Sequence, residues 1–182
     1  MLKTSLIVCE EEQNLMNREK TVFLDTSALI PLLTECHSNH NKVRRYLREI
    51  KGSYCIDSIV LSEFLTKNES PEIKRRYLEI IAKEFRVFSL STVGAQIGAS
   101  IFCHLLEKNA VPKGKMDRQI TRVDVLVLAS AIENRVDTLL YEDKHFSFMV
   151  NNINDLKIPR FFVPELVQIQ DIPNDLFDRI TS

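Results

Sequence analysis

Four acidic residues of this 182-residue chain stand beside apolar segments, where a carboxylate without a partner is costly to bury. Asp25 ends the apolar run in VFLDTSALI, and Asp143 follows the run in TLLYEDKHF. Glu63 and Asp124 lie near the starts of apolar helical stretches, SIVLSEFL and TRVDVLVLASAI. Hard divalent cations such as Mg²⁺ prefer oxygen ligands, and converging carboxylates are the usual protein contribution. The four acids therefore predict a metal-dependent enzyme.

Short apolar segments alternate with helical ones along the chain, a pattern that predicts βαβ units and a parallel sheet. Strands are expected at Val22–Leu24, Tyr54–Ile56, Arg86–Ser89, Thr138–Tyr141 and near Phe161–Val163. Ligands of open α/β sheets bind outside the carboxyl ends of the strands. Asp25 and Asp143 would lie at that edge, where they are poorly placed for packing and well placed for chemistry.

The helices expected between these strands carry the other two acids. They cover ALIPLL, Asn39–Ile50, SIVLSEFL, EIKRRYLEIIAKEF, Thr92–Lys108 and Val123–Asn134. We expect Thr26 or Ser27 to cap the first helix and Ser58 to cap the helix that carries Glu63. The stretch VPKGKMDRQIT is predicted to be a loop because of its Pro and Gly.

Length and composition indicate an ordinary single-domain globular protein, with 45% hydrophobic and 27% charged residues. We expect a poorly fixed N-terminal extension at residues 1–20, a folded domain at 21–165, and a C-terminal tail at 166–182 that forms a short helix. Residues 1–15 should be dispensable for activity, because Met16 offers an alternative start. The apolar run LIVC is too short for a signal-peptide core or a membrane span, which predicts no membrane association.

The cysteines and histidines indicate neither a disulfide framework nor a zinc site. Cys9, Cys36, Cys55 and Cys103 are scattered, and no C-x-x-C pair occurs. Reduced cysteines predict a cytoplasmic protein. No Gly-rich phosphate loop or G-x-S-x-G motif occurs either. The net charge of −1 excludes a global attraction to nucleic acid, although it says nothing about a local basic patch.

Each acid also has a purely structural interpretation. Asp25 could cap the helix that follows it, although Thr26 and Ser27 could do so instead. Asp124 has the spacing of a capping-box variant and would suit the first turn of a helix. Glu63 taken alone could be a solvated residue on an amphipathic helix. The hypothesis of a shared site depends on the set rather than on any one member.

The last acidic position is ambiguous, because Glu142 stands beside Asp143 and neighbours on a strand point to opposite faces. Asp57, just after the second expected strand, is a candidate auxiliary member. Carboxylates held close together raise one another's pKa unless a cation neutralises them. Mg²⁺ or Mn²⁺ could acidify a water and stabilise the charge on a phosphate, which is what hydrolysis of a phosphodiester requires.

The motifs VFLDTSALI, SEFL, VDVLVLASAI and YEDKHF, in this order, resemble the acidic motifs of PIN-domain ribonucleases, especially VapC-type toxins of toxin–antitoxin pairs. The similarity runs from Val22 to Val163. It implies an α/β fold, a three-layer α/β/α sandwich with a central parallel sheet, and RNA cleavage that depends on Mg²⁺ or Mn²⁺. The family's four acids match Asp25, Glu63, Asp124 and Asp143, which would coordinate the metal.

The resemblance also implies that Ser27 orients Asp25 or a water on the metal, that a small antitoxin blocks the acidic pocket, and that the protein is a homodimer. The sequence departs from the family at Tyr141, where the family often has Thr. A phenol at this position would crowd the site.

Basic residues that lead up to Asp124 could hold RNA phosphates beside the metal. They are Lys113, Lys115, Arg118 and Arg122. Two other basic groups, Lys42–Arg48 and Lys74–Arg76, are better explained as solvated helix faces.

Two other functions fit part of the sequence. The string LDTSA also resembles the active-site motif of retroviral-type aspartic proteases, in which two Asp residues activate water without a metal. Those proteins are all-β with glycine-rich turns, whereas this chain has four glycines and many helical segments. The second alternative is a PIN-like module that has lost catalysis and binds RNA or protein. The presence of all four acids argues against it.

Overall fold

The computed structural model describes residues 19–66, 69–111, 114–153, 156 and 163–173, with the backbone alone for 115–117. The expected N-terminal extension up to residue 18 lies outside the described residues, as do Lys113 and the end of the expected tail, 174–182. Residues 157–162, which include the start of the last expected strand, lie outside them too.

Five parallel strands form the central sheet. They are β1 (Thr21–Leu24), β2 (Ser53–Asp57), β3 (Phe85–Phe88), β4 (Thr138–Tyr141) and β5 (Glu165–Gln168). Their order in the sheet is β3-β2-β1-β4-β5. Val22, Phe23 and Leu24 of the central strand β1 are fully buried, as expected for a strand covered on both faces. The predicted parallel sheet is confirmed, and its last strand lies a few residues later than expected.

Helices cover both faces of this sheet. They are α2 (Thr26–Leu33), α3 (His40–Ile50), α4 (Ser58–Leu65), α5 (Pro71–Glu84), α6 (Thr92–Glu107), α7 (Lys115–Glu133) and α8 (Lys144–Asn152), with a 3₁₀ helix, η1 (Ile169–Asp171), after β5. No helix in the described ranges has the length and apolar character needed to cross a membrane.

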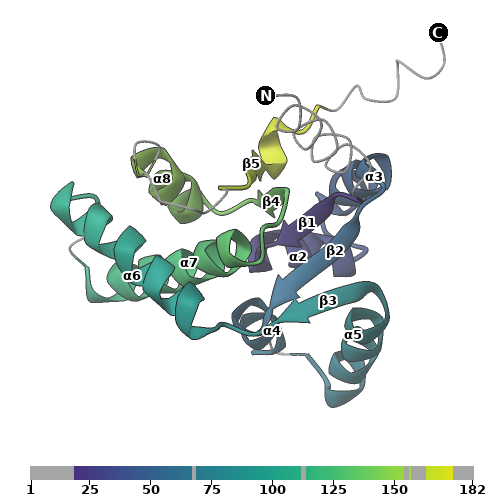
Figure 1. The fold of residues 1–182 in the computed structure, drawn as a ribbon. Helices are drawn as coiled ribbons and strands as arrows, with labels where there is room; N and C mark the ends of the chain where they lie inside the picture. Colours follow the sequence, from purple (N-terminus) through teal and green to yellow (C-terminus); the bar gives the residue numbers. More distant parts are fainter. Residues whose placement is uncertain (1–18, 67–68, 112–113, 154–155, 157–162, 174–182) are drawn as a thin grey trace, which may run out of the picture.

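The direction of the connections separates these helices into two layers. The chain moves from β1 to β3 in one direction across the sheet and from β3 to β5 in the other. Because crossovers between parallel strands are right-handed, the two sets of connecting helices lie on opposite faces. Figure 1 shows α6, α7 and α8 to the left of the sheet and α3 and α5 to its right. The expected three-layer α/β/α arrangement is confirmed.

Two glycines allow α6 to pack closely against α7. A Cβ atom at Gly98 would lie 3.0 Å from a methyl group of Leu126. At Gly94 a Cβ atom would lie 2.5 Å from a carboxylate oxygen of Glu133, so any larger residue there would displace that side chain. This close contact fixes the position of α7, the helix that carries Asp124.

Two helices differ from the sequence prediction. α7 begins at Lys115, so much of the predicted loop VPKGKMDRQIT is helical. Gly114 is the N-cap of this helix, and Gly is among the residues favoured there, so the glycine marks a helix start and not a longer loop. α8 was not among the predicted elements, although apolar residues spaced i, i+3, i+4 form its buried face. These residues are Phe146, Met149 and Val150.

Candidate active site

The strand order changes direction between β1 and β4, and the carboxyl ends of two such strands border the crevice where open α/β sheets bind ligands. Asp25 directly follows β1, and its backbone N–H donates to Leu140 O of β4 at 3.0 Å. Asp143 follows the end of β4 closely. The two strand-end acids therefore lie at the same edge of the sheet, beside this switch point.

Asp25 is buried, with 6% of its surface exposed, and it is the N-cap of α2. Its Oδ2 accepts hydrogen bonds from Ser27 N at 3.1 Å and from Ser27 Oγ at 2.6 Å. Burial raises the pKa of the Asp25 carboxyl, and the hydrogen bonds from Ser27 oppose that shift. The prediction that Thr26 or Ser27 caps this helix is wrong, because Asp25 has the extended backbone of an N-cap and its carboxylate reaches the first turn.

Glu63 of α4 is brought to Asp25 by a contact between helices. Thr26 Oγ1, next to Asp25, donates to Glu63 Oε2 at 2.6 Å. Glu63 is half-buried, and its negative charge contributes to raising the pKa of Asp25. The interpretation of Glu63 as an isolated solvated residue is therefore wrong.

Asp57 performs a structural task at the end of β2. Its side chain is fully buried and caps α4, since Oδ1 accepts from Ile59 N at 3.0 Å and from Val60 N at 2.8 Å. Burial raises its pKa, and these hydrogen bonds oppose the shift. The prediction that Ser58 caps α4 is wrong, because the carboxylate one residue earlier already satisfies the first turn.

Asp124 lies within α7, well past the first turn, so a role in capping or in balancing the helix dipole does not apply to it. Its Oδ2 is buried and has no hydrogen-bond partner among the residues that the structure describes. Burial raises the pKa of Asp124 to about 8, with further contributions from the negative charges of Asp25, Asp143 and Glu63. The structure therefore brings the four predicted acids into one electrostatic cluster.

Asp143 is exposed and is the N-cap of α8, where its Oδ1 accepts from His145 N at 2.5 Å. The backbone N–H groups of Glu142 and Asp143 donate to Ser27 Oγ at 2.9 and 3.3 Å. The carboxylate of Glu142 points elsewhere, because it accepts a hydrogen bond from the Asn39 side chain. Of the two neighbouring acids, it is Asp143 whose charge acts on Asp124.

The chemistry of this cluster fits a hard divalent cation, since the carboxylates offer only oxygen donors and the Asp124 carboxyl is buried with an orphaned oxygen. Within the described part of the chain, no three Asp, Glu, His or Cys side chains are already arranged to hold a metal ion. Asp25, Glu63 and Asp143 each use one carboxylate oxygen to accept a hydrogen bond from a neighbouring donor.

Of the basic residues proposed for RNA binding, Lys115, Arg118 and Arg122 lie on α7 and not on a loop, and Lys113 lies outside the described residues. Arg122 is exposed, and its guanidinium lies 5.1 Å from the centre of the Phe102 ring of α6. Side chains two residues apart on a helix are separated by roughly 200°, so Arg122 and Asp124 leave α7 on opposite sides. Arg118 is also exposed. The phosphate-binding role of these residues, and of Lys113 and Lys115, stays a prediction.

The phenol of Tyr141 packs away from solvent, with 5% of the residue exposed. Its ring centre lies 4.9 Å from that of Phe146 in α8. The residue that departs from the expected family pattern thus anchors α8 to the end of β4.

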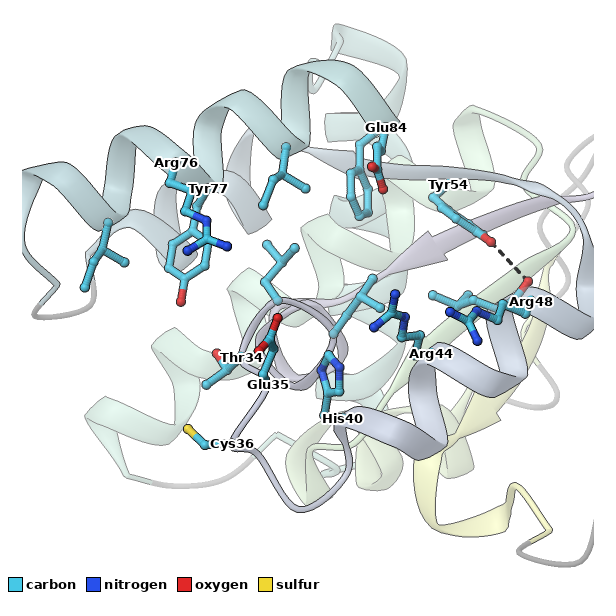
Figure 2. Close-up of a pocket in the computed structure, with 16 residues that line it drawn as sticks. Thr34, Glu35, Cys36, His40, Arg44, Arg48, Tyr54, Arg76, Tyr77 and Glu84 are labelled. Atoms are coloured by element: carbon cyan, nitrogen blue, oxygen red, sulfur yellow. Dashed lines mark hydrogen bonds between the residues drawn. The ribbon is translucent and has the colours of Figure 1, made fainter.

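A recess that does not belong to the acidic site, hereafter the α3–α5 groove, lies among α2, α3 and α5. Its volume is about 710 Å³. Its described lining residues do not include the four acids, and apolar side chains form much of its wall, including Leu33, Leu47, Ile80 and Phe85. Figure 2 shows Arg44 and Arg48 on one side and Arg76 and Tyr77 on the other.

The α3–α5 groove has apolar surface that remains open to solvent. Ile73, one of its lining residues, is 40% exposed. Three arginines and two glutamates, Glu35 and Glu84, share its rim. The sequence predicted solvated basic faces on both helices, and the arginines are indeed exposed, but the sequence did not indicate that they face one groove.

A family comparison agrees with this geometry. The model of the PIN domain matches residues 22–149, most of the chain. The chain therefore belongs to the PIN domain family. No curated protein sequence matches the chain closely enough to count as a relative.

Solved structures share the fold at low sequence identity. A chain of VapBC-1 from nontypeable Haemophilus influenzae is 14% identical, with a TM-score of 0.58 and coverage of 82% of this chain and 98% of that one. A chain of VapBC2 from Rickettsia felis, bound to a DNA fragment from its promoter, is 18% identical, with a TM-score of 0.54 and coverage of 81% and 98%. VapC20 from Mycobacterium tuberculosis, a toxin that cleaves the sarcin–ricin loop, is 18% identical, with a TM-score of 0.51 and coverage of 69% and 92%. At these identities the similarity concerns the fold alone.

Proposed function

We propose that this protein is a metal-dependent endoribonuclease of the toxin type, which hydrolyses RNA phosphodiester bonds. The observation that carries the proposal is the pKa of Asp124, which burial and the charges of Asp25, Asp143 and Glu63 raise to about 8. Like charges that a fold holds together against their repulsion are typical of functional sites. A divalent cation would remove the repulsion.

When bound, Mg²⁺ or Mn²⁺ would supply a Lewis acid that activates water and neutralises charge on the scissile phosphate. The residues that would hold it are Asp25, Glu63, Asp124 and Asp143. Ser27 would fix the position of the Asp25 carboxylate relative to the backbone of Asp143, because its hydroxyl forms hydrogen bonds to both. Phosphate contacts would come from Lys113, Lys115, Arg118 and Arg122.

The direct test is cleavage of a pool of structured RNAs by the purified full chain with Mg²⁺, Mn²⁺ or EDTA. Asp25→Asn and Asp124→Asn preparations, purified in parallel, control for contaminating nucleases. We expect cleavage that requires the metal and is lost in both variants. Cleavage that persists in both variants, or in EDTA, would contradict the proposal.

A second candidate function is a PIN-like module that binds RNA or protein without catalysis. One observation favours it: no three described acidic, histidine or cysteine side chains are arranged to hold a metal as they stand. Calorimetric titration of the metal-free protein with Mn²⁺ separates the two functions. Binding that Asp124→Asn abolishes supports the nuclease, whereas no binding by the wild-type protein supports the module.

We further propose that a small antitoxin protein binds the α3–α5 groove, in place of the acidic pocket that the family resemblance implies. Known structures with the same fold include VapBC toxin–antitoxin complexes. An amphipathic helix could place an apolar face against the wall of the groove and acidic residues beside Arg44, Arg48 and Arg76. The product of a neighbouring reading frame is the first partner to test.

The remaining parts of the proposal come from the sequence. They are a homodimer, a cytoplasmic location, a nuclease domain at 21–165 and an N-terminal extension that activity does not require. Light scattering of the purified chain tests the dimer. Truncation to Met16 tests the extension, and a folded but inactive truncated protein would contradict that part.

A further inference from the structure

The carboxylate of Glu142 ties together three segments that are distant in sequence. Asn39 Nδ2, at the start of α3, donates to Glu142 Oε1, and Gln170 Nε2, in η1, lies 3.4 Å from the same oxygen. Lys42 Nζ donates to Gln170 O at 3.0 Å, which joins α3 to η1 directly. Glu142 itself belongs to the turn between β4 and α8.

The backbone of Glu142 contacts the acidic site. Its N–H donates to Ser27 Oγ at 2.9 Å, and the N–H of Asp143 lies 3.3 Å from the same hydroxyl. Ser27 Oγ in turn donates to Asp25 Oδ2 at 2.6 Å. Glu142 thus connects the contacts of its side chain with the hydroxyl that joins Asp25 to the peptide of Asp143.

Asn39 occupies a position where the side chain of an Asn normally caps its own helix. It is the N-cap of α3, a position where Asn is favoured because its side chain accepts hydrogen bonds from the first turn. In the described structure its side chain makes no such capping bond and donates to Glu142, 103 residues further along the chain. A local stabilising contact has been replaced by a contact with the turn that carries Asp143.

We propose that Asn39, Glu142 and Gln170 form a positioning clamp, which holds the β4–α8 turn and so sets the affinity of the acidic site for a divalent cation. None of the three is itself a metal ligand in this proposal. They act through the turn, because a shift of the Glu142 backbone would move Asp143 relative to Asp25. The inference rests on the proposed metal site.

A purely structural clamp would stabilise the fold without affecting the metal. A hydrogen bond to a charged group stabilises the folded state, so its removal lowers stability under either hypothesis. Metal affinity distinguishes them. Groups that orient the ligands of a metal typically change affinity by about 10–100-fold when removed.

The experiment is a calorimetric titration of the metal-free full chain with Mn²⁺, without RNA, at a pH near 8, together with a thermal unfolding curve for each variant. We expect Asn39→Ala and Glu142→Ala each to weaken Mn²⁺ binding by about tenfold. Glu142→Gln keeps an acceptor oxygen for Asn39 and should bind Mn²⁺ nearly as the wild type does. The double variant should be little weaker than either single one, because both remove the same contact.

Two controls keep the outcome decisive. Lys42→Ala removes only the bond to the Gln170 backbone and should leave Mn²⁺ affinity near that of the wild type. Asp143→Asn should weaken binding most.

Unchanged affinity in Asn39→Ala and Glu142→Ala, with lowered thermal midpoints, would overturn the clamp and leave the nuclease standing. If Glu142→Ala does not fold, the Mn²⁺ affinity of Asn39→Ala decides the question alone, because Asn39 is only half-buried. Wild-type protein that binds no Mn²⁺ would overturn the proposed function and this inference together.

Discussion

The acidic site and the α3–α5 groove are two regions of the same molecule that are built in opposite ways. The acids come from four separate places, after β1, on α4, on α7 and after β4, and the fold holds their like charges together. The groove is lined by α2, α3 and α5 with the starts of β2 and β3, and its wall is largely apolar. The acidic site carries unfavourable electrostatic free energy, and the groove leaves apolar surface exposed to water.

The difference indicates what would bind to each region. A cation would relieve the repulsion among the carboxylates, whereas a protein segment would cover the apolar wall of the groove. The four acids and the lining residues of the groove do not overlap among the described residues. Substitutions in one region should therefore leave the function of the other unchanged, and each prediction below tests that independence.

The largest expected effect is on catalysis. Asp124→Asn should lower the rate of RNA cleavage by about a thousandfold, because the loss of a metal ligand removes several kcal/mol of transition-state stabilisation. Asp25→Asn should have an effect of similar size. The measurement is single-turnover cleavage of a labelled RNA.

Binding of the antitoxin partner provides the control for these variants. Both should bind it as the wild type does, since neither residue lines the groove. A variant that loses cleavage and partner binding together would show that the acidic site and the groove are not independent.

The next effect concerns the pH dependence of stability in EDTA. Asp124 has a pKa of about 8 in the folded protein and an ordinary value of 3.8. Between these values the folded state binds more protons than the unfolded state, so the free energy of unfolding falls as the pH rises. Asp124→Asn carries no charge there and should exceed the wild type in stability at a pH near 8, by on the order of 3 kcal/mol. Urea denaturation at several pH values measures this.

Addition of Mn²⁺ should reverse the order of the two proteins. The cation binds the ionised cluster of the wild type, and stabilisation by a ligand grows with its free concentration. The wild type should then become the more stable protein at the higher pH. If Asp124→Asn is less stable than the wild type in EDTA, the carboxylates do not repel one another as the structure indicates.

The groove should respond to charge reversal. The double variant Arg44→Glu, Arg76→Glu should weaken binding of an acidic antitoxin by about 30-fold, because like charges would then face each other across the interface. RNA cleavage by the free protein should not change. Calorimetry with the purified product of a neighbouring reading frame measures the affinity.

Arg75→Glu is the matched control, because Arg75 is exposed on the same helix and does not belong to the described lining of the groove. It should weaken binding much less than Arg76→Glu. Equal effects of the two substitutions would mean that the partner senses only net charge and does not occupy the groove.

The sequence predicted which acids lie at the edge of the sheet better than it predicted the contacts of their side chains. β4 was placed at its observed bounds because four apolar or β-branched residues precede two acids. The parallel sheet then placed Asp25 and Asp143 at one edge without further information. The predicted start of the helix that became α7 was wrong, because a Pro followed two residues later by a Gly indicates a loop and a helix N-cap equally well.

Long-range side-chain contacts left no local pattern in the sequence. The sequence indicated Thr26 as a helix cap, but its hydroxyl donates to Glu63. Only the packing of α2 against α4 determines that contact. Asn39 and Glu142 are even further apart in the chain. The α3–α5 groove was missed for the same reason, since each basic helix taken alone looks like an ordinary solvated face.

The smallest expected effect concerns RNA binding along α7, and it tests how far the bound RNA extends beyond the acidic site. Arg122 leaves the helix on the side opposite Asp124 and lies over Phe102, so RNA that contacts it must extend past the cluster. Arg122→Ala and Arg118→Ala should each weaken RNA binding by about two- to fivefold. Each should also lower the slope of log affinity against log salt concentration by the equivalent of about one phosphate contact. Binding is measured with Asp25→Asn protein, which cannot cleave the probe.

Phe102→Leu separates charge from stacking at this position. It removes the ring beneath the guanidinium and leaves the positive charge, so the salt dependence of RNA binding should stay as in the wild type. Arg122→Ala should reduce it. If neither arginine variant alters the salt dependence, RNA does not run along this face of α7, and the nuclease must take its phosphate contacts from another surface beside the four acids.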